Sequence, residues 1–283
     1  MSISITKNRF NIRSNKFLLN ILLEDKTTGQ NIKWATDIYS YLGNDFSSSN
    51  EISPCNIERF IQSRVDKNKH EQNYRTKEQA EVFTPSWSCN RQNNLIDEAW
   101  FNRKNIFNTE CGNRWVTNPE SISMPQGKSW KDYILANRME ISCGEAPYLT
   151  NRYDVTTGLS IKVNDRIGML DRKLRIINEN VDNPRTWFSW VKKAYKHIYG
   201  FDIQGDNVFL ARENLLLTFI DNMEYKLKKL PSKRQIYDIA RIISWNIWQM
   251  DGLTYSTPYS NAKSINQLSL FSQEDNNESL ITK

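Results

Sequence analysis

Apolar residues recur every three to four positions along most of the chain, which is the spacing of an amphipathic α-helix. Gly43 and Pro231 stand where two of these patterns stop, and Pro184 stands where another begins, as is common at helix ends. The pattern predicts helices over residues 32–43, 56–70, 86–101, 165–180, 184–198, 206–230 and 232–242.

Three short apolar runs predict strands at residues 139–142, 199–205 and 242–247. Strands that alternate with helices of this length indicate a sheet of βαβ units with helices on both faces. Residues 102–128 are rich in Asn, Gly and Pro and predict a loop. The predicted organisation is an N-terminal helical region at 1–64, an α/β domain at 65–257 and a disordered tail at 258–283.

The composition fits a globular protein with a substantial core. The chain has 283 residues, of which 39% are hydrophobic, and a formal net charge of +6. The positive charge favours a polyanionic partner such as DNA, although a solvated basic surface explains it about as well. No apolar run approaches the roughly 20 residues that span a bilayer, and the N-terminus has no signal-peptide pattern. We therefore expect a cytoplasmic protein.

The cysteines and histidines give little support to a metal site. The chain has four cysteines and two histidines, and the cysteines form no Cys-x-x-Cys pair. Reduced thiols in a cytoplasmic protein are the simpler interpretation.

Three polar or glycine-containing loops follow the predicted strands. In open α/β sheets, ligands bind beyond the carboxyl ends of the strands. Gly144 permits close approach of a ligand to the backbone, Asp202 offers two acceptor oxygens for a ribose, and Asn246 offers a donor and an acceptor for an adenine edge. Each has an ordinary alternative: a tight turn at Gly144, a helix cap at Asp202 and a backbone contact at Asn246.

Four segments in this order resemble adenine-specific DNA methyltransferases of restriction–modification systems. These segments are AEVFTP at 80–85, EISCGEAPYL at 140–149, IYGFDIQGDNVFLARENLL at 198–216 and ISWNIWQMDGL at 243–253. The resemblance covers about residues 65–255 and implies a partial Rossmann-like, S-adenosylmethionine-dependent methyltransferase fold.

The resemblance also implies a set of cofactor contacts. The methionine moiety would meet Phe83 and Thr84, the ribose Asp202 and the adenine Asn246. The glycine turn would contribute Cys143, Gly144 and Glu145. Glu145 and Ala146 stand where the family usually has Ser-Gly, so the turn is expected to be less open.

The catalytic signature of the family, Asp/Asn-Pro-Pro-Tyr/Phe, does not occur in the sequence. The nearest string is STPYSN at 256–261, and about 25 residues follow Pro258, fewer than the missing strands and a recognition domain need. We expect a cofactor-binding modification component that acts on DNA with a catalytic or recognition subunit. The alternatives are a non-catalytic, DNA-associated relic encoded by a phage or mobile element, and a methyltransferase for another substrate.

The tail contains QLSLF at 267–271, which resembles the peptide that binds the bacterial sliding clamp. In that resemblance Gln267 makes polar contacts, while Leu270 and Phe271 fill an apolar pocket and Leu268 lies between them. The alternative is that these apolar residues pack on their own domain.

Overall fold

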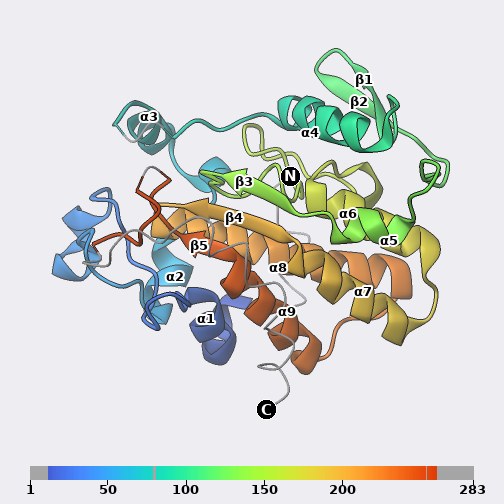
Figure 1. Ribbon diagram of the computed structural model, residues 1–283. Coiled ribbons are helices and arrows are strands. Elements are labelled where there is room, and N and C mark those ends of the chain that lie inside the picture. The colour runs from blue at the N-terminus through green and yellow to red at the C-terminus, as the bar shows by residue number, and fades with distance from the viewer. Residues whose placement is uncertain (1–11, 79–80, 253, 260–283) are drawn as a thin grey trace.

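The computed structural model describes residues 12–78, 81–252 and 254–259. At its centre is a sheet of three parallel strands in the order β3-β4-β5 (Figure 1). The strands are β3 (Arg138–Ile141), β4 (Ile198–Asp202) and β5 (Ile247–Gln249). Ile141 pairs with Phe201, and Asp202 pairs with Gln249, so the three carboxyl ends meet at one edge of the sheet.

Four helices connect these strands. They are α6 (Met169–Asn180) and α7 (Pro184–Lys196) before β4, and α8 (Gly205–Leu227) and α9 (Lys233–Asn246) before β5. The Asn183 side chain accepts from two backbone N–H groups at the start of α7, and Ser232 with Gln235 forms a capping box at the start of α9. The chain is thus an α/β protein, as the sequence predicted.

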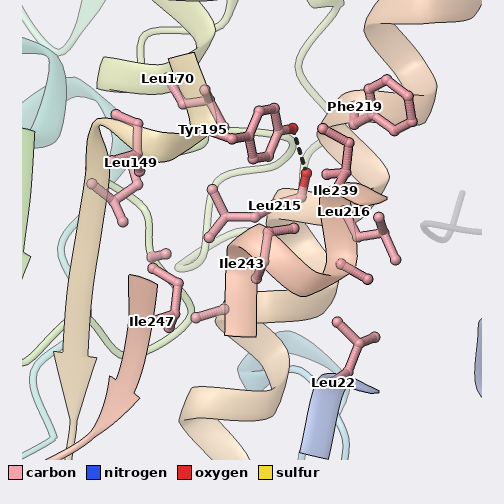
Figure 2. Packing of buried hydrophobic residues seen from close by; sticks show 14 of the residues in the cluster. Leu22, Leu149, Leu170, Tyr195, Leu215, Leu216, Phe219, Ile239, Ile243 and Ile247 are labelled. Atoms are coloured by element: carbon pink, nitrogen blue, oxygen red, sulfur yellow. Dashed lines mark hydrogen bonds between the residues drawn. The ribbon is translucent and has the colours of Figure 1, made fainter. Parts of the chain in front are cut away.

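Helices α7, α8 and α9 pack against one face of the sheet (Figure 1). Between them and the strands lies the core, where Leu149, Ile243 and Ile247 are almost completely buried (Figure 2). The Tyr195 hydroxyl donates to the carbonyl of Leu215 at 2.8 Å, so this buried polar group is satisfied.

The opposite face of the sheet is only partly covered. Met139, Tyr199 and Trp248 are half-buried, and Ile141 is 62% exposed. The rings of Tyr199 and Trp248 stack with centroids 5.8 Å apart. Helices therefore cover one face of the sheet fully, as predicted, and the other face only in part.

Arg212 on α8 joins three parts of the fold. Its guanidinium is completely buried and donates to the carbonyls of Leu22, Glu24 and Ile247 at 2.6–3.0 Å. Burial lowers the pKa of Arg212 to about 10. The N-terminal region, α8 and the start of β5 are therefore connected through one side chain.

The N-terminal region contains α1 (Lys16–Leu23) and α2 (Pro54–Phe60), with short 3₁₀ turns η1 (Ile12–Ser14), η2 (Ser40–Leu42) and η3 (Asn44–Phe46). Leu18 and Leu22 of α1 belong to the same core as α8 and α9. Arg13 forms an ion pair with Glu213 of α8 at 2.6 Å. The predicted boundary near residue 64 is therefore not a boundary of the core.

The helix predicted at 32–43 is wrong. Ile32 and Trp34 are completely buried, and residues between and beside them are more exposed, which is the two-residue period of extended backbone. Trp34 N donates to Asn50 O at 3.0 Å, and Ile52 N donates to Ile32 O at 2.8 Å. Pairing with residues 50–52 replaces the intrahelical hydrogen bonds.

The segment from residue 63 to the sheet contains η4 (Arg64–Asp66), α3 (Lys69–Glu78), α4 (Ser86–Phe101), a hairpin of β1 (Asn108–Cys111) and β2 (Arg114–Thr117), and α5 (Trp130–Leu135); η5 (Val163–Asp165) precedes α6. Helix α4 spans the predicted residues. The predicted helix at 56–70 is instead divided among α2, η4 and α3, and the predicted loop at 102–128 contains the hairpin.

None of the described helices has the length and apolar character needed to cross a membrane.

Candidate functional site at the carboxyl edge of the sheet

The turn after β3 has an unusual backbone. Ser142, Gly144 and Ala146 all have left-handed φ values, +52°, +52° and +64°. Glycine adopts this conformation without strain, whereas a residue with a Cβ rarely does. In this turn the backbone N–H of Gly144 faces Asp202 at the end of β4.

Asp202, the last residue of β4, joins this turn to the start of α8. Its Oδ2 accepts from Gly144 N and its Oδ1 accepts from Gln204 N, each at 2.9 Å. The residue is 8% exposed, and burial, with smaller effects of Glu81 and Asp206, raises the pKa of Asp202 to about 6. The helix-cap alternative is not met, because the N-cap of α8 is Gln204 and no side chain caps the helix; Asp202 instead joins the glycine turn to the residue that precedes α8.

Glu140 holds the far end of the same turn. It lies in β3 and accepts from Tyr148 N at 3.4 Å and from Leu149 N at 3.2 Å. Burial raises the pKa of Glu140 well above its usual range. In the sequence Glu140 was only one residue of the EISCGEAPYL string; in the structure its carboxylate accepts hydrogen bonds from the backbone that follows the glycine turn.

The segment 81–85 contacts the start of α8 and the Arg64 side chain. Glu81 accepts from Asn207 Nδ2 of α8 and from Arg75 Nε, each at 2.7 Å. The guanidinium of Arg64 lies 4.0 Å from the centre of the Phe83 ring. Thr84 is half-buried and its carbonyl accepts from the Cys89 thiol. Phe83 is thus linked to the glycine turn through Arg64, whose backbone N–H donates to Glu145, whereas its neighbour Thr84 contacts Cys89 of α4.

The side chains of Cys143 and Glu145 point into the protein. Cys143 is 1% exposed and Glu145 is 2% exposed. Glu145 accepts from Arg64 N at 2.6 Å and from the Tyr153 hydroxyl at 2.5 Å. A ligand at this edge would meet the backbone of the turn, because the two flanking side chains are already engaged.

Asn246 does not lie where the sequence placed it. The predicted strand at 242–247 is wrong: α9 continues to Asn246, and β5 begins only at Ile247. The Asn246 amide donates to the carbonyls of Tyr195 and Ile198 at 2.9 and 3.1 Å, at the amino end of the sheet. This is the backbone contact of the ordinary alternative, and it is remote from Asp202 along the strands.

Asp251, and not Asn246, follows the carboxyl end of β5. The chain leaves β5 with Met250 N donating to the carbonyl of Asp202 at 3.0 Å, and the half-buried Asp251 follows. The acid belongs to the QMDGL string of the sequence. It was not identified because the third strand was predicted to end at residue 247, whereas β5 ends at Gln249.

A buried ionic cluster lies at the start of α8, next to this edge of the sheet. Arg75 is 1% exposed and pairs with Asp206 at 2.5 Å and with Glu81 at 2.7 Å. Asp206 also accepts from the Tyr39 hydroxyl at 2.9 Å. Burial opposes ionisation of Asp206, but Arg75 and Lys67 lower its pKa overall. These residues are far apart in the sequence, and no motif connected them.

The STPY string lies beside the edge strand β5. Thr257, Pro258 and Tyr259 line a small cavity of about 160 Å³ together with Lys33 and Gln249. Tyr259 is 59% exposed, and the Lys33 ammonium lies 5.8 Å from the centre of its ring. The four tail residues Gln267, Leu268, Leu270 and Phe271 lie outside the described residues, as does the rest of STPYSN after Tyr259.

No family model matches the sequence, and neither the curated proteins nor the solved structures contain a match to this chain. Within the described residues, no group of three or more His, Cys, Asp or Glu side chains is placed to hold a metal ion. The geometry of the sheet edge is therefore the main guide to function.

Proposed function

We propose that the chain binds S-adenosylmethionine at the carboxyl edge of its parallel sheet, as a DNA adenine-N6 methyltransferase-like modification component of a restriction–modification system. The observation that carries the proposal is the 2.9 Å hydrogen bond from Gly144 N to the Asp202 carboxylate, which joins the glycine turn to the acid at the end of the next strand. Ligands of open α/β sheets bind at this position.

Each part of the edge supplies a group of suitable chemistry. Both oxygens of Asp202 keep a lone pair beyond the backbone bonds that they accept, so the carboxylate retains acceptor capacity for a ribose diol. Phe83 offers an apolar ring beside the methionine moiety, and Asp251 replaces Asn246 as the acceptor for an adenine amino group. In this proposal the Rossmann-like fold of the resemblance is the framework of the site.

The activity on DNA is proposed to need a partner. Tyr259 is largely exposed, and Ser256 and Thr257 replace the amide or acid and the first proline of the family's catalytic string. A catalytic or recognition subunit would supply both the base-holding loop and the DNA sequence preference. Contacts of this chain with DNA would be mainly to phosphates, so they would weaken steeply with salt.

A second candidate, the non-catalytic relic, is favoured by the closed state of the turn. Both Asp202 oxygens already accept backbone N–H groups, and the buried Glu145 side chain, which stands where the family usually has Ser, accepts from the backbone N–H of Arg64. A relic would keep the fold without binding the cofactor.

Calorimetric titration with S-adenosylmethionine separates the two candidates. We expect a dissociation constant in the micromolar range, or about −7 to −8 kcal/mol. The constant should rise as the pH falls below about 6, because protonation removes an acceptor from Asp202. Absence of binding at millimolar cofactor would support the relic and refute the cofactor site.

A further inference from the structure

A cavity of about 450 Å³ is lined by the loop at 152–166 and by the last turns of α8. Its volume falls within the roughly 300–1,000 Å³ that is usual for small-molecule sites. Asp221 in its wall lies about 22 Å further along α8 than Asp206, at about 1.5 Å per residue. Tyr153, also in the wall, donates to Glu145 of the glycine turn. The cavity is therefore distinct from the candidate cofactor site, although Tyr153 connects the two.

The charged side chains of this cavity carry a surplus of positive charge. Four lining residues are cationic and two are acidic: Arg152, Lys162, Arg166 and Lys228, and Asp221 and Glu224. Oδ2 of Asp221 accepts from Arg152 Nε at 3.0 Å and from Arg166 Nη2 at 2.7 Å. Burial opposes ionisation of Asp221, but the two arginines lower its pKa overall, so the carboxylate is charged at neutral pH. One negative charge is thus shared by two guanidinium groups.

The pairing of Arg166 within the wall is incomplete. Its side chain is 7% exposed, and its Nε donates to the carbonyl of Ile161 at 3.3 Å. Its Nη1 is buried and has no hydrogen-bond partner among the described residues. A buried charged donor without an acceptor is unfavourable, and negative charge in the cavity would offset the surplus. The electrostatics of the cavity therefore favour an anionic ligand.

An aromatic ring lies next to one of the cations. Tyr225 is 40% exposed, and the half-buried Ile161 and Val163 add apolar surface to the same lining. The Lys228 ammonium lies 5.2 Å from the centre of the Tyr225 ring and donates to the Tyr225 carbonyl at 2.8 Å. Any nucleic-acid base can stack on such a ring, because every base has a π-face. Cations beside an exposed ring suit a phosphorylated nucleoside better than an inorganic anion.

We propose that this cavity binds a nucleoside phosphate, with its phosphates at Lys162 and Lys228 and its base on the Tyr225 ring. A free nucleotide and a nucleotide within a single strand present the same phosphate and base, so both are sources of this chemistry. The site is additional to the proposed function and does not depend on binding of S-adenosylmethionine.

Calorimetry on the full chain with cytidine diphosphate provides the test. A pyrimidine nucleotide is chosen because adenosine compounds also suit the proposed cofactor site. We expect a dissociation constant in the micromolar range, and binding of cytidine weaker by at least about 10-fold, because cytidine lacks the groups that form charge-assisted hydrogen bonds. Binding of cytidine diphosphate should weaken as the salt concentration rises.

The role of the cations is tested with a matched pair of variants. Lys162→Gln removes an exposed cation of the lining and should weaken binding of cytidine diphosphate by about 10-fold. Lys196→Gln makes the same change in net charge at an exposed position of α7 that does not line the cavity, and should bind as the parent chain does. Thermal unfolding of each variant shows that it is folded.

The role of the ring is tested with a second pair. Tyr225→Ala should weaken binding of cytidine diphosphate by about 10-fold or more, whereas Tyr225→Phe keeps the ring and should retain the affinity. Inorganic pyrophosphate should bind the parent chain more weakly than cytidine diphosphate, and Tyr225→Ala should not change its affinity.

Competition with a single-stranded oligodeoxycytidylate identifies the source of the nucleotide. Displacement of cytidine diphosphate would show that the cavity takes a nucleotide of a strand, and binding without displacement would show that it takes a free nucleotide. No binding of cytidine diphosphate at millimolar concentration, equal binding by the parent chain, Lys162→Gln and Tyr225→Ala, or equal affinity for pyrophosphate would overturn the proposal.

Discussion

Replacement of Asp202 by asparagine should separate the charge of this residue from its shape. In the native protein its two oxygens accept from Gly144 N and Gln204 N, and burial raises its pKa from 3.8 to about 6. The side-chain amide is similar in size but has one acceptor atom, so one of the two N–H groups loses its partner. The substitution therefore removes one hydrogen bond and one buried charge.

The two effects act in opposite directions at neutral pH. A difference of about two pKa units corresponds to about 3 kcal/mol, by which ionisation of the buried Asp202 destabilises the folded state above pH 6. The lost hydrogen bond costs about 1–3 kcal/mol. At pH 7 the variant should thus be nearly as stable as the parent chain, while binding S-adenosylmethionine more weakly by about 1.5–3 kcal/mol.

The sign of the pH dependence follows from the direction of the shift. Between pH 3.8 and 6 the folded state holds the Asp202 proton and the unfolded state has lost it, so the contribution of Asp202 to stability decreases as the pH rises. The parent chain should gain about 3 kcal/mol relative to Asp202→Asn when the pH is lowered from 7 to 4. Comparison of the two proteins cancels the other titrating groups.

Urea denaturation followed by tryptophan fluorescence at several pH values measures this difference. The sequence contains nine tryptophans, which provide the signal. A stability difference that stays constant from pH 4 to pH 7 would contradict the burial of an ionisable carboxylate at the end of β4.

Three other outcomes are expected. Arg212→Met should lower the free energy of unfolding, measured in urea, by about 3–5 kcal/mol, because it leaves buried carbonyls without donors. The control variant Arg234→Met, at an exposed position, should leave it unchanged, and equal stability of the two variants would refute the role of Arg212. The purified chain alone should not methylate mixed genomic DNA with tritiated cofactor, and incorporation abolished by Tyr259→Ala would show that STPY is catalytic. A peptide of residues 258–283 should bind a purified bacterial sliding clamp at micromolar affinity, and a signal unchanged after Leu270→Ala and Phe271→Ala would exclude the QLSLF contact.

The sequence predicted the helices of the sheet region well because their patterns are long and locally capped. Helix α4 spans the predicted residues, and α7 begins at Pro184 as predicted. Where the apolar pattern was short, tertiary pairing decided the structure: Ile32 and Trp34 pair with residues 50–52 and form no helix. At α9, buried Ile236, Ala240 and Ile243 continue a helical period through the predicted strand.

The candidate site was predictable in part. The glycine turn and Asp202 were found because acids and glycines after parallel strands carry a local signal. Asp251 was missed because its identification depended on a strand boundary. Arg75 and Lys67 were missed for a different reason: they meet Asp206, more than a hundred residues further along the chain, and only the fold brings them together.

The contacts between the N-terminal region and the end of the sheet have a consequence for the time at which the protein folds during synthesis. Arg13 and Glu213 are 200 residues apart, and Lys33, whose backbone N–H and carbonyl both bind the Gln249 amide, is 216 residues from its partner. At translation rates of about 5–20 residues per second, Leu18 and Leu22 of α1 would be synthesised roughly 10–40 s before the helices α8 and α9 that they pack against. Nascent chains stalled before residue 200 should therefore expose this apolar segment to chaperones and proteases, and chains stalled after the sheet has emerged should protect it.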